Sequence, residues 1–248
     1  MNTERVDDIP LIYQLPAGED RHKLVLFLAG FSGDKESCAP RLEELAALGF
    51  TALSFDAWQH GQRMRTDVAE LRARVRGNIR RYFWPILAHT AREVPRIIDW
   101  ALERFCLDES VGIGGISMGG DISVVAAALD RRIVVAVPGV ATPDWLRPGT
   151  FEPVGQADAA AQDCYDELNP LTHLEGYAHC PRIVFQNGAD DQQVPAEASV
   201  RFREALRRTH YQDCPERIET VLHAATAHAY TEAMWDNTKR LLAEHLNE

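Results

Sequence analysis

Short apolar runs alternate along the chain with longer segments in which apolar residues recur every three or four positions. Each run is short enough to form one buried strand. The runs occupy residues 22–30, 50–57, 110–117, 132–140, 182–188 and 217–225. Strands that alternate with helical segments in this way are typical of a mostly parallel sheet.

The amphipathic segments predict helices on both faces of this sheet, because each segment offers one apolar side for packing. They span residues 35–48, 92–105, 118–129, 196–209 and 231–246. The first twenty residues are expected to add a small antiparallel edge. The pattern therefore predicts an α/β fold with a mostly parallel central sheet, in a single domain over residues 1–248.

Two segments depart from the alternation. Residues 64–91 begin as an arginine-rich helical pattern around Leu71, are interrupted at Gly77 and then resume, which predicts a helix, a break and a second helix. Residues 141–170 follow the strand at 132–140 and hold four prolines and two glycines. Because plain connections in compact α/β units are short, we expect a small cap or lid-like insertion here, over one edge of the sheet.

Composition and charge narrow the possible partners. The 248 residues are 46% hydrophobic and 25% charged, which is typical of a globular protein with a sizeable core. The net charge of -11 and the scattered arginines disfavour nucleic acid. The N-terminus has no apolar signal-peptide core, and no segment approaches the roughly 18 apolar residues of a membrane span. We expect a cytoplasmic protein without a membrane partner, and the sequence indicates no oligomeric state.

The cysteines and histidines do not form a metal-binding pattern. The five cysteines are odd in number, widely spaced and without a C-x-x-C pair, which disfavours a disulfide framework and a zinc site. They are Cys38, Cys106, Cys164, Cys180 and Cys214. The histidines show no H-E-x-x-H spacing. We therefore expect no metal and no organic cofactor.

The sequence GISMG at residues 115–119 fits the pattern G-x-S-x-G. It follows an apolar strand and precedes an alanine-rich helix, which is the context of a nucleophile elbow with Ser117 at its tip. The plainer interpretation is a glycine-rich turn with an incidental serine. A nucleotide-binding turn is disfavoured, because Ser117 stands where G-x-G-x-x-G requires its third glycine.

A serine nucleophile needs a base and an acid, and both types of residue follow in the order this fold requires. The loop NGADDQQVP at 187–195 offers Asp190 and Asp191, and the residues alone leave this choice open. After the last strand, HAATAHAY at 223–230 offers His223 and His228. We favour His228, because it lies in the loop and His223 belongs to the strand. Both loops are expected at the carboxyl edge of the sheet, beside Ser117.

These motifs make the chain resemble an α/β-hydrolase, and more narrowly the dienelactone-hydrolase and prolyl-oligopeptidase-like esterases. The similarity spans roughly residues 22 to 247. In this branch the acid lies in G-x-x-D-x-x-V-P, and GADDQQVP at 188–195 fits with Asp191 as the acid. The base follows as G-x-x-H, where this chain has Ala225 in place of the glycine. The resemblance thus implies a triad of Ser117, Asp191 and His228.

The resemblance also implies an oxyanion hole. The family segment H-G-x-x-G corresponds here to AGFSG at 29–33, with Ala29 in place of the histidine. In this fold one backbone N–H comes from that loop and another from the residue after the nucleophile. Phe31 and Met118 are the corresponding residues. The alternative is that 29–33 is an ordinary glycine turn between a strand and a helix.

Substrate contacts are expected from a second loop and from aromatic residues. The loop DAWQHGQR at 56–63 resembles one that is largely structural in related esterases, so Asp56, His60 and Arg63 tie the loop together or face the pocket. Several aromatic residues are candidate pocket walls, although core packing is the common role of each taken singly. They are Trp58, Tyr82, Phe83, Trp84 and Trp145. The predicted substrate-binding residues are Trp58, His60 and Trp145.

These expectations combine into a serine hydrolase that cleaves small carboxylic esters through an acyl-enzyme on Ser117. One alternative is a peptidase or amidase of the same fold, although the sequence holds no large propeller of the kind with which prolyl oligopeptidases select peptides. Another is a binding protein that keeps the scaffold without turnover. A complete set of serine, acid and histidine in the required order argues against the binding protein.

Overall fold

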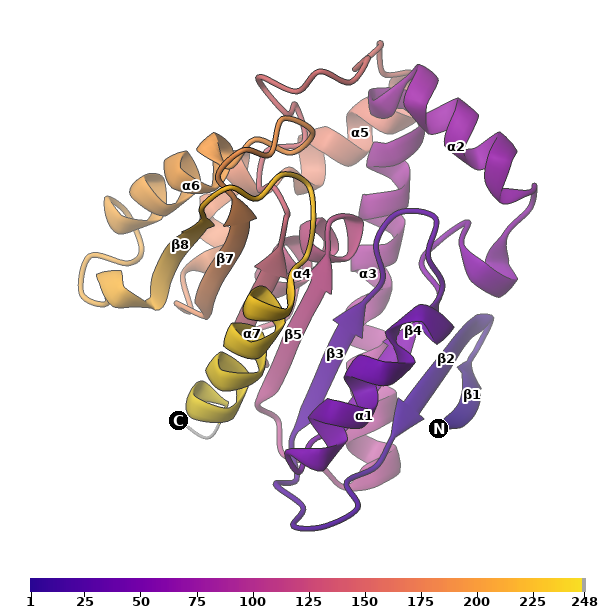
Figure 1. Cartoon of the computed structure of the whole chain (residues 1–248), viewed down its shortest axis with the longest axis vertical. Helices are drawn as coiled ribbons and strands as arrows, with labels where there is room; N and C mark the ends of the chain where they lie inside the picture. Colours follow the sequence, from indigo (N-terminus) through magenta and orange to yellow (C-terminus); the bar gives the residue numbers. More distant parts are fainter. Residues whose placement is uncertain (247–248) are drawn as a thin grey trace.

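The computed structural model describes residues 1–246, and strands within them form one eight-stranded sheet of order β1-β2-β4-β3-β5-β6-β7-β8 (Figure 1). The strands are β1 (Asn2–Val6), β2 (Ile9–Gln14), β3 (Leu24–Leu28), β4 (Thr51–Phe55), β5 (Val111–Ile116), β6 (Ile133–Gly139), β7 (Arg182–Gly188) and β8 (Ile218–His223). Neighbouring strands from β4 to β8 are parallel, whereas β1 and β2 pair antiparallel at the edge. The predicted mostly parallel sheet with a small antiparallel edge is confirmed.

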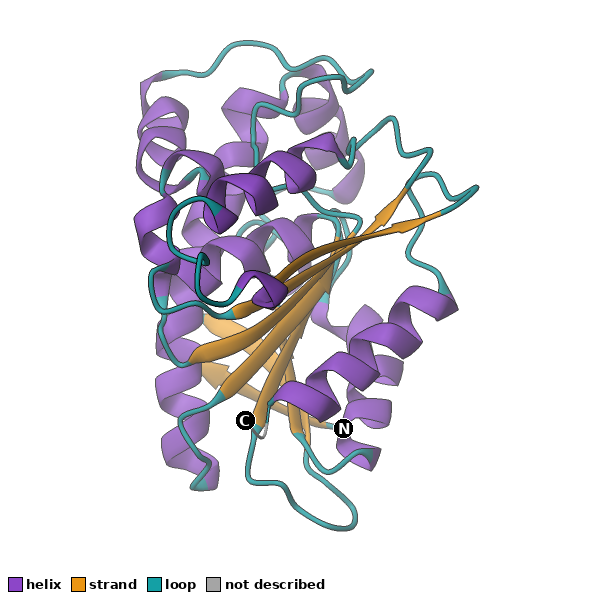
Figure 2. Ribbon diagram, turned by 90° about the vertical axis from the view of Figure 1, so that its left-hand side faces the viewer, coloured by secondary structure: helices purple, strands orange, loops and turns teal. Residues whose placement is uncertain are grey.

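Helices cover both faces of the sheet, as Figure 2 shows. The helices are α1 (Ala39–Ala47), α2 (Val68–Gly77), α3 (Ile79–Phe105), α4 (Met118–Leu129), α5 (Ala159–Leu168), α6 (Glu197–Arg207) and α7 (Glu232–His245). Short 3-10 turns are η1 (Lys35–Cys38), η2 (Gly61–Arg63), η3 (Pro170–Thr172), η4 (Leu174–Tyr177) and η5 (Pro215–Arg217). One apolar core lies under α1 and α7, and the other lies under α3, α4 and α6. Because helices cover the central strands on both faces, β3 and β4 are buried along their whole length.

The irregular segment before β5 forms the predicted helix, break and second helix, but the second helix is longer than predicted. The break lies at Asn78, which separates α2 from α3, and the helix predicted at 92–105 is the second half of α3. Two prolines, Pro85 and Pro95, lie inside this 27-residue helix. Each proline removes one backbone hydrogen bond, but a stripe of buried side chains from Ile79 to Ala101 packs α3 on the sheet.

Residues 141–170 form an insertion above the carboxyl ends of the parallel strands (Figure 1). The first part is irregular, and the second part contains α5, which packs against α3. The insertion therefore stands over the same end of the sheet at which the loops after β3, β5 and β7 begin.

Residues 1–246 contain no helix that is both long and apolar enough to cross a membrane.

Candidate active site

Ser117 lies in a sharp turn between β5 and α4. Its backbone has φ 52° and ψ −110°, and its N–H donates to the carbonyl of Gly139 at 2.8 Å. A positive φ is costly for a residue with a side chain, so the surroundings must hold this conformation. A Cβ on Gly115 would lie 2.5 Å from the Gly119 carbonyl carbon, and one on Gly119 would lie 2.3 Å from the Leu28 carbonyl oxygen. The turn therefore requires glycine on both sides of the serine.

The loops after β7 and β8 bring an acid and a base to this serine. The Nε2 atom of His228 lies 3.0 Å from Ser117 Oγ, and its Nδ1 lies 2.7 Å from Asp191 Oδ2. The second oxygen of Asp191 accepts the backbone N–H groups of Gln193 at 2.9 Å and Val194 at 2.8 Å. The Asp191 side chain is fully buried, and that of His228 is 21% exposed. A buried carboxylate with fixed backbone donors orients the imidazole toward the serine.

The geometry separates the alternatives that the residues left open. Asp190 is exposed, and its backbone N–H donates to the carbonyl of Thr226. His223 ends β8 and places its Nε2 2.8 Å from Gln186 Oε1. Of the two candidate pairs, Asp191 and His228 are the members that contact each other, and His228 also contacts Ser117.

The loop at 29–33 lies against the start of α4. The carbonyl oxygens of Leu28 and Ala29 approach Gly119 so closely that no side chain fits there. Met118 is the first residue of α4, where a helix leaves its N–H groups without an intrahelical acceptor, and no loop or turn hydrogen bond within residues 1–246 uses the N–H of Phe31. An oxyanion hole requires two such N–H groups near the nucleophile.

A buried ion pair fixes the start of η1, which follows this loop. Lys35 Nζ lies 3.1 Å from Asp56 Oδ2, and both side chains are fully buried. The backbone N–H of Lys35 donates to the other oxygen of Asp56 at 3.0 Å. Asp56 thereby ties the segment after the 29–33 loop to the end of β4.

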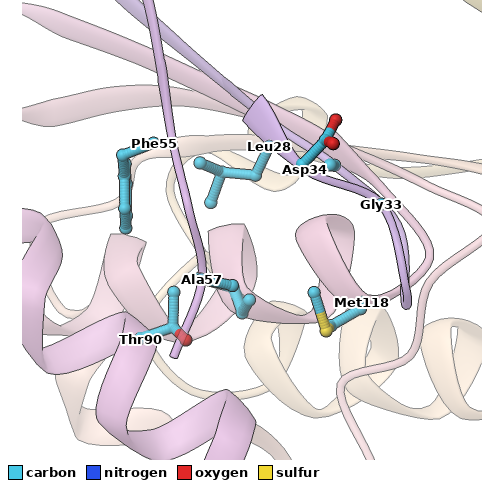
Figure 3. A pocket seen from close by; sticks show the side chains of 9 residues that line it. Leu28, Gly33, Asp34, Phe55, Ala57, Thr90 and Met118 are labelled. Atoms are coloured by element: carbon cyan, nitrogen blue, oxygen red, sulfur yellow. The ribbon is translucent and has the colours of Figure 1, made fainter. Parts of the chain in front are cut away.

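A small cavity lies beneath the loop, and Figure 3 shows the side chains that line it. The Met118 side chain points into this space together with Leu28, Phe55 and Ala57. Met118 is 1% exposed, so its side chain belongs to the core. Any role of Met118 beside Ser117 must therefore come from its backbone N–H.

A pocket of about 60 Å³ opens beside Ser117, with room for a few non-hydrogen atoms. Its apolar lining residues are Phe31, Val75, Ile79 and Phe83, and its polar lining residues besides Ser117 are Arg76, Arg147, Glu152 and Gln193. Sequence reasoning missed the polar residues. Arg147 and Glu152 lie in the irregular insertion and Arg76 lies on α2, where no motif marks them; only Gln193 falls within the acid motif.

The three predicted substrate contacts lie outside this pocket. Trp145 is 1% exposed and packs in the core, and Trp58 packs against His89 with ring centres 4.7 Å apart and the ring planes tilted by 38°. His60 is fully buried, and its ring packs edge-on against Phe31. The prediction that Trp58, His60 and Trp145 line the pocket therefore does not hold: the folded 56–63 loop turns Trp58 and His60 into packing contacts, and the insertion buries Trp145 in the core.

The 56–63 loop has the structural role that the sequence offered as one alternative. Asp56 accepts the backbone N–H of Gln62 at 2.8 Å, and Arg63 forms two hydrogen bonds with Glu93 at 2.7 and 2.6 Å. Burial lowers the pKa of His60, although the Trp58 carbonyl and Asp56 oppose this shift. A neutral imidazole can donate its Nδ1–H to that carbonyl, 3.0 Å away.

A second buried ion pair lies behind the pocket. Arg147 Nη2 donates to Asp121 Oδ2 at 2.8 Å, and Asp121, in the first turn of α4, is fully buried. The other Asp121 oxygen accepts the backbone N–H of Thr142 at 2.8 Å. Burial raises the pKa of Asp121, and the Arg147 charge opposes this shift. The ion pair thus links the insertion to α4.

Within residues 1–246, no group of three or more His, Cys, Asp or Glu side chains could hold a metal ion.

Comparison with known families agrees with this fold and geometry. The family model described as the prolyl oligopeptidase family matches residues 89–239. The chain belongs to this family. Its fold is that of an α/β-hydrolase, which confirms the resemblance that the serine, acid and base motifs indicated.

Individual relatives cover most of the chain. Esterase YjfP of Escherichia coli K12 is 28% identical over 221 residues, which are 84% of this chain and 85% of the relative. The structure of TT1662 from Thermus thermophilus has a TM-score of 0.78 at 22% identity and covers 100% of this chain and 98% of its own. A putative dienelactone hydrolase from Klebsiella pneumoniae has a TM-score of 0.66 at 18% identity, with 97% and 93% coverage.

Proposed function

We propose that this protein is a serine hydrolase that cleaves small carboxylic esters through an acyl-enzyme on Ser117. The observation that carries the proposal is the continuous chain of contacts from Ser117 through His228 to Asp191. The esterase name of the relative YjfP and the limited size of the pocket support an ester substrate. The cytoplasmic location and the absence of a nucleic-acid partner stay predictions from the sequence.

The first half of the reaction acylates the enzyme. Ser117 Oγ attacks the ester carbonyl while His228 Nε2 takes the hydroxyl proton. Asp191 holds the Nδ1–H and stabilises the imidazolium, and the N–H groups of Phe31 and Met118 receive the negative charge on the carbonyl oxygen. Collapse of the intermediate breaks the ester bond, and His228 gives its proton to the departing alcohol.

Water completes the reaction by the same route. His228 removes a proton from water as the water oxygen attacks the acyl carbon, and the proton then returns to Ser117 Oγ when the acid leaves. The products are the alcohol and the carboxylic acid, and the enzyme is restored.

A peptidase or amidase is the second candidate, because the family to which the chain belongs is named for prolyl oligopeptidase. A chain-length series of 4-nitrophenyl esters measured beside an aminoacyl arylamide separates the two. We expect ester hydrolysis with a preference for short acyl groups. Faster hydrolysis of the arylamide, as kcat/KM, would move the assignment to amide cleavage.

Four paired substitutions and one at the serine test the assigned roles. Ser117→Ala, Asp191→Asn and His228→Ala should each lose kcat/KM by about 10³-fold or more. Asp190→Asn and His223→Ala are the matched controls and should stay near the parent rate, with circular dichroism verifying that each variant is folded. Ser117→Ala within about tenfold of the parent would refute an acyl-enzyme on this residue. Hydrolysis of neither ester nor amide by the folded parent would favour the binding-protein alternative.

A further inference from the structure

The pocket beside Ser117 carries charge that ester cleavage itself does not use. Two of its lining residues are arginines, Arg76 and Arg147, and only Glu152 among the pocket-lining residues is acidic. The chain as a whole has a net charge of -11, which repels anions. A pair of guanidinium groups beside the nucleophile therefore stands out from the charge of the molecule.

Arg147 is held in place by residues behind the pocket. Its side chain is 6% exposed, and its guanidinium lies 4.8 Å from the centre of the Phe83 ring. One nitrogen, Nη2, is committed to Asp121. The other, Nη1, lies 3.5 Å from Glu152 Oε2, beyond the 2.7–3.2 Å of an ordinary hydrogen bond. One edge of this guanidinium is thus fixed, and the other is only weakly occupied.

Glu152 lies in the irregular part of the insertion, where its backbone N–H donates to Thr150 Oγ1 at 3.1 Å while its carboxylate makes only long contacts. Its other oxygen, Oε1, accepts from Gln193 Nε2 at a long 3.3 Å, and the preceding Phe151 is 69% exposed. The Glu152 carboxylate therefore neutralises the pocket through two weak contacts. Arg76 is exposed at the same pocket and has no acidic partner among the residues that the structure describes.

We propose that the pocket selects short esters whose acyl group ends in a carboxylate. The substrate carboxylate takes the place of Glu152 against Arg147 Nη1, and Arg76 supplies the second positive charge. Phe31 and Phe83 pack against the carbon chain between the two ends. A pocket of about 60 Å³ limits the acyl group to a short chain, and succinyl is a short acyl group that ends in a carboxylate. This inference rests on the proposed ester hydrolysis and names the substrate class for it.

The test compares two esters of equal shape and different charge. Monoethyl succinate carries the terminal carboxylate, and ethyl 4-oxopentanoate carries a methyl ketone in its place. Initial rates in a pH-stat at neutral pH and low salt give kcat/KM for each. We expect the parent protein to prefer the anionic ester by about tenfold, the value of one charge-assisted hydrogen bond. Equal rates, or a preference for the ketone, would overturn the proposal.

Variants are compared by one ratio, kcat/KM for monoethyl succinate divided by kcat/KM for ethyl 4-oxopentanoate. This ratio does not depend on the fraction of the enzyme that is folded. Arg76→Gln should lower the anion preference about two- to fivefold, and Glu152→Gln should raise it by a similar factor. Arg74→Gln removes the same charge from the same helix outside the pocket and should leave the ratio unchanged. An unchanged ratio in Arg76→Gln or Glu152→Gln would contradict the assigned contacts.

The same assay separates this inference from the proposed function. Hydrolysis of ethyl 4-oxopentanoate that is lost in Ser117→Ala supports ester cleavage whatever the charge preference. Turnover of that ester without an anion preference would refute only the substrate class. If the parent protein hydrolyses neither of the two esters and none of the 4-nitrophenyl esters, both ester cleavage and the substrate class are refuted.

Discussion

Ser117 of the triad and Ala225, near His228, adopt a backbone conformation that is costly for any residue except glycine. Ser117 has φ 52°, and Ala225, three residues before His228, has φ 51°. At the elbow, the flanking glycines and the Gly139 carbonyl hold Ser117 in place. Near Ala225 the base loop is held to the acid loop, because the Ala189 N–H donates to His223 O and the Asp190 N–H donates to Thr226 O. These contacts set the φ of Ala225 despite its side chain.

Replacing Ala225 with glycine should stabilise the fold. The left-handed conformation costs a residue with a Cβ about 1–2 kcal/mol, and glycine loses about 0.5–1 kcal/mol of this gain through its freer unfolded chain. We expect Ala225→Gly to raise the free energy of unfolding in guanidinium by about 0.5–1 kcal/mol. The neighbouring Ala224→Gly should lower it, because Ala224 has no positive φ. A loss of stability in Ala225→Gly would show that its side chain contributes more than the strain costs.

At the scale of elements, Asn78 joins three segments around the pocket. It ends α2, and its Oδ1 accepts the backbone N–H of Arg81 in the first turn of α3 at 3.0 Å. Its Nδ2 donates to the carbonyl of Gln156 in the insertion at 2.9 Å. One side chain therefore sets the angle between α2 and α3 and holds the insertion to them.

Asn78→Ala should cost more than the loss of an ordinary helix cap. A cap alone contributes about 1 kcal/mol, and the lost bond to Gln156 adds to this, so we expect a decrease of about 1.5–2.5 kcal/mol in the free energy of unfolding. Asp67→Ala removes only the cap of α2, where Asp67 Oδ1 accepts the Glu70 N–H, and should cost about 1 kcal/mol. Denaturant unfolding of both variants measures the difference. Equal losses would mean that the bond to the insertion contributes nothing.

At the scale of the whole molecule, burial of histidine links stability to pH. Burial is the main cause of the lowered pKa of His60, whose ordinary value is 6.5. The unfolded chain therefore binds a proton at this site at a higher pH than the folded protein does. The resulting stability is fully present above about pH 6.5 and is lost as the pH falls through and below this value.

Substitution of His60 by asparagine should flatten this dependence. The amide of asparagine can still donate to the Trp58 carbonyl but does not titrate, so the decrease in the free energy of unfolding between about pH 7.5 and about pH 5.5 should be smaller than in the parent. His22→Asn, at an exposed histidine, should leave the slope unchanged. Thermal unfolding across this range provides the comparison. Parallel curves for the parent and His60→Asn would place the pH-linked groups elsewhere.

In α3, the local sequence pattern was not sufficient to predict the length of the helix. An interior proline costs a helix about 3 kcal/mol, so Pro85 and Pro95 favour separate short helices over residues 64–105. The burial of residues such as Phe83, Leu87 and Val94 offsets this cost. That burial depends on how α3 lies across the sheet, which is not written in any short window of the sequence.

The sequence by itself determined the strands, most of the helices and the loops that carry Ser117, the acid and His228. The choice of Asp191 over Asp190 came from the resemblance to the family motif. Strand and helix periodicities are local, and a strand-turn-helix with glycines around a serine is local too. Parallel strands then bring the three loops to one edge without further information. The prediction of the strands, helices and loops therefore needed only short-range patterns and the order in which they follow one another.

Only the tertiary structure decided which side chains surround the serine. Trp58, His60 and Trp145 point into packing contacts, whereas Arg76, Arg147 and Glu152 reach the pocket. The contact between Arg147 and Asp121 exists because the insertion folds back over α4, and a buried charge is stable only beside such a partner. Pocket chemistry depends on contacts between segments far apart in the chain, and those contacts are set by the packing of the whole molecule.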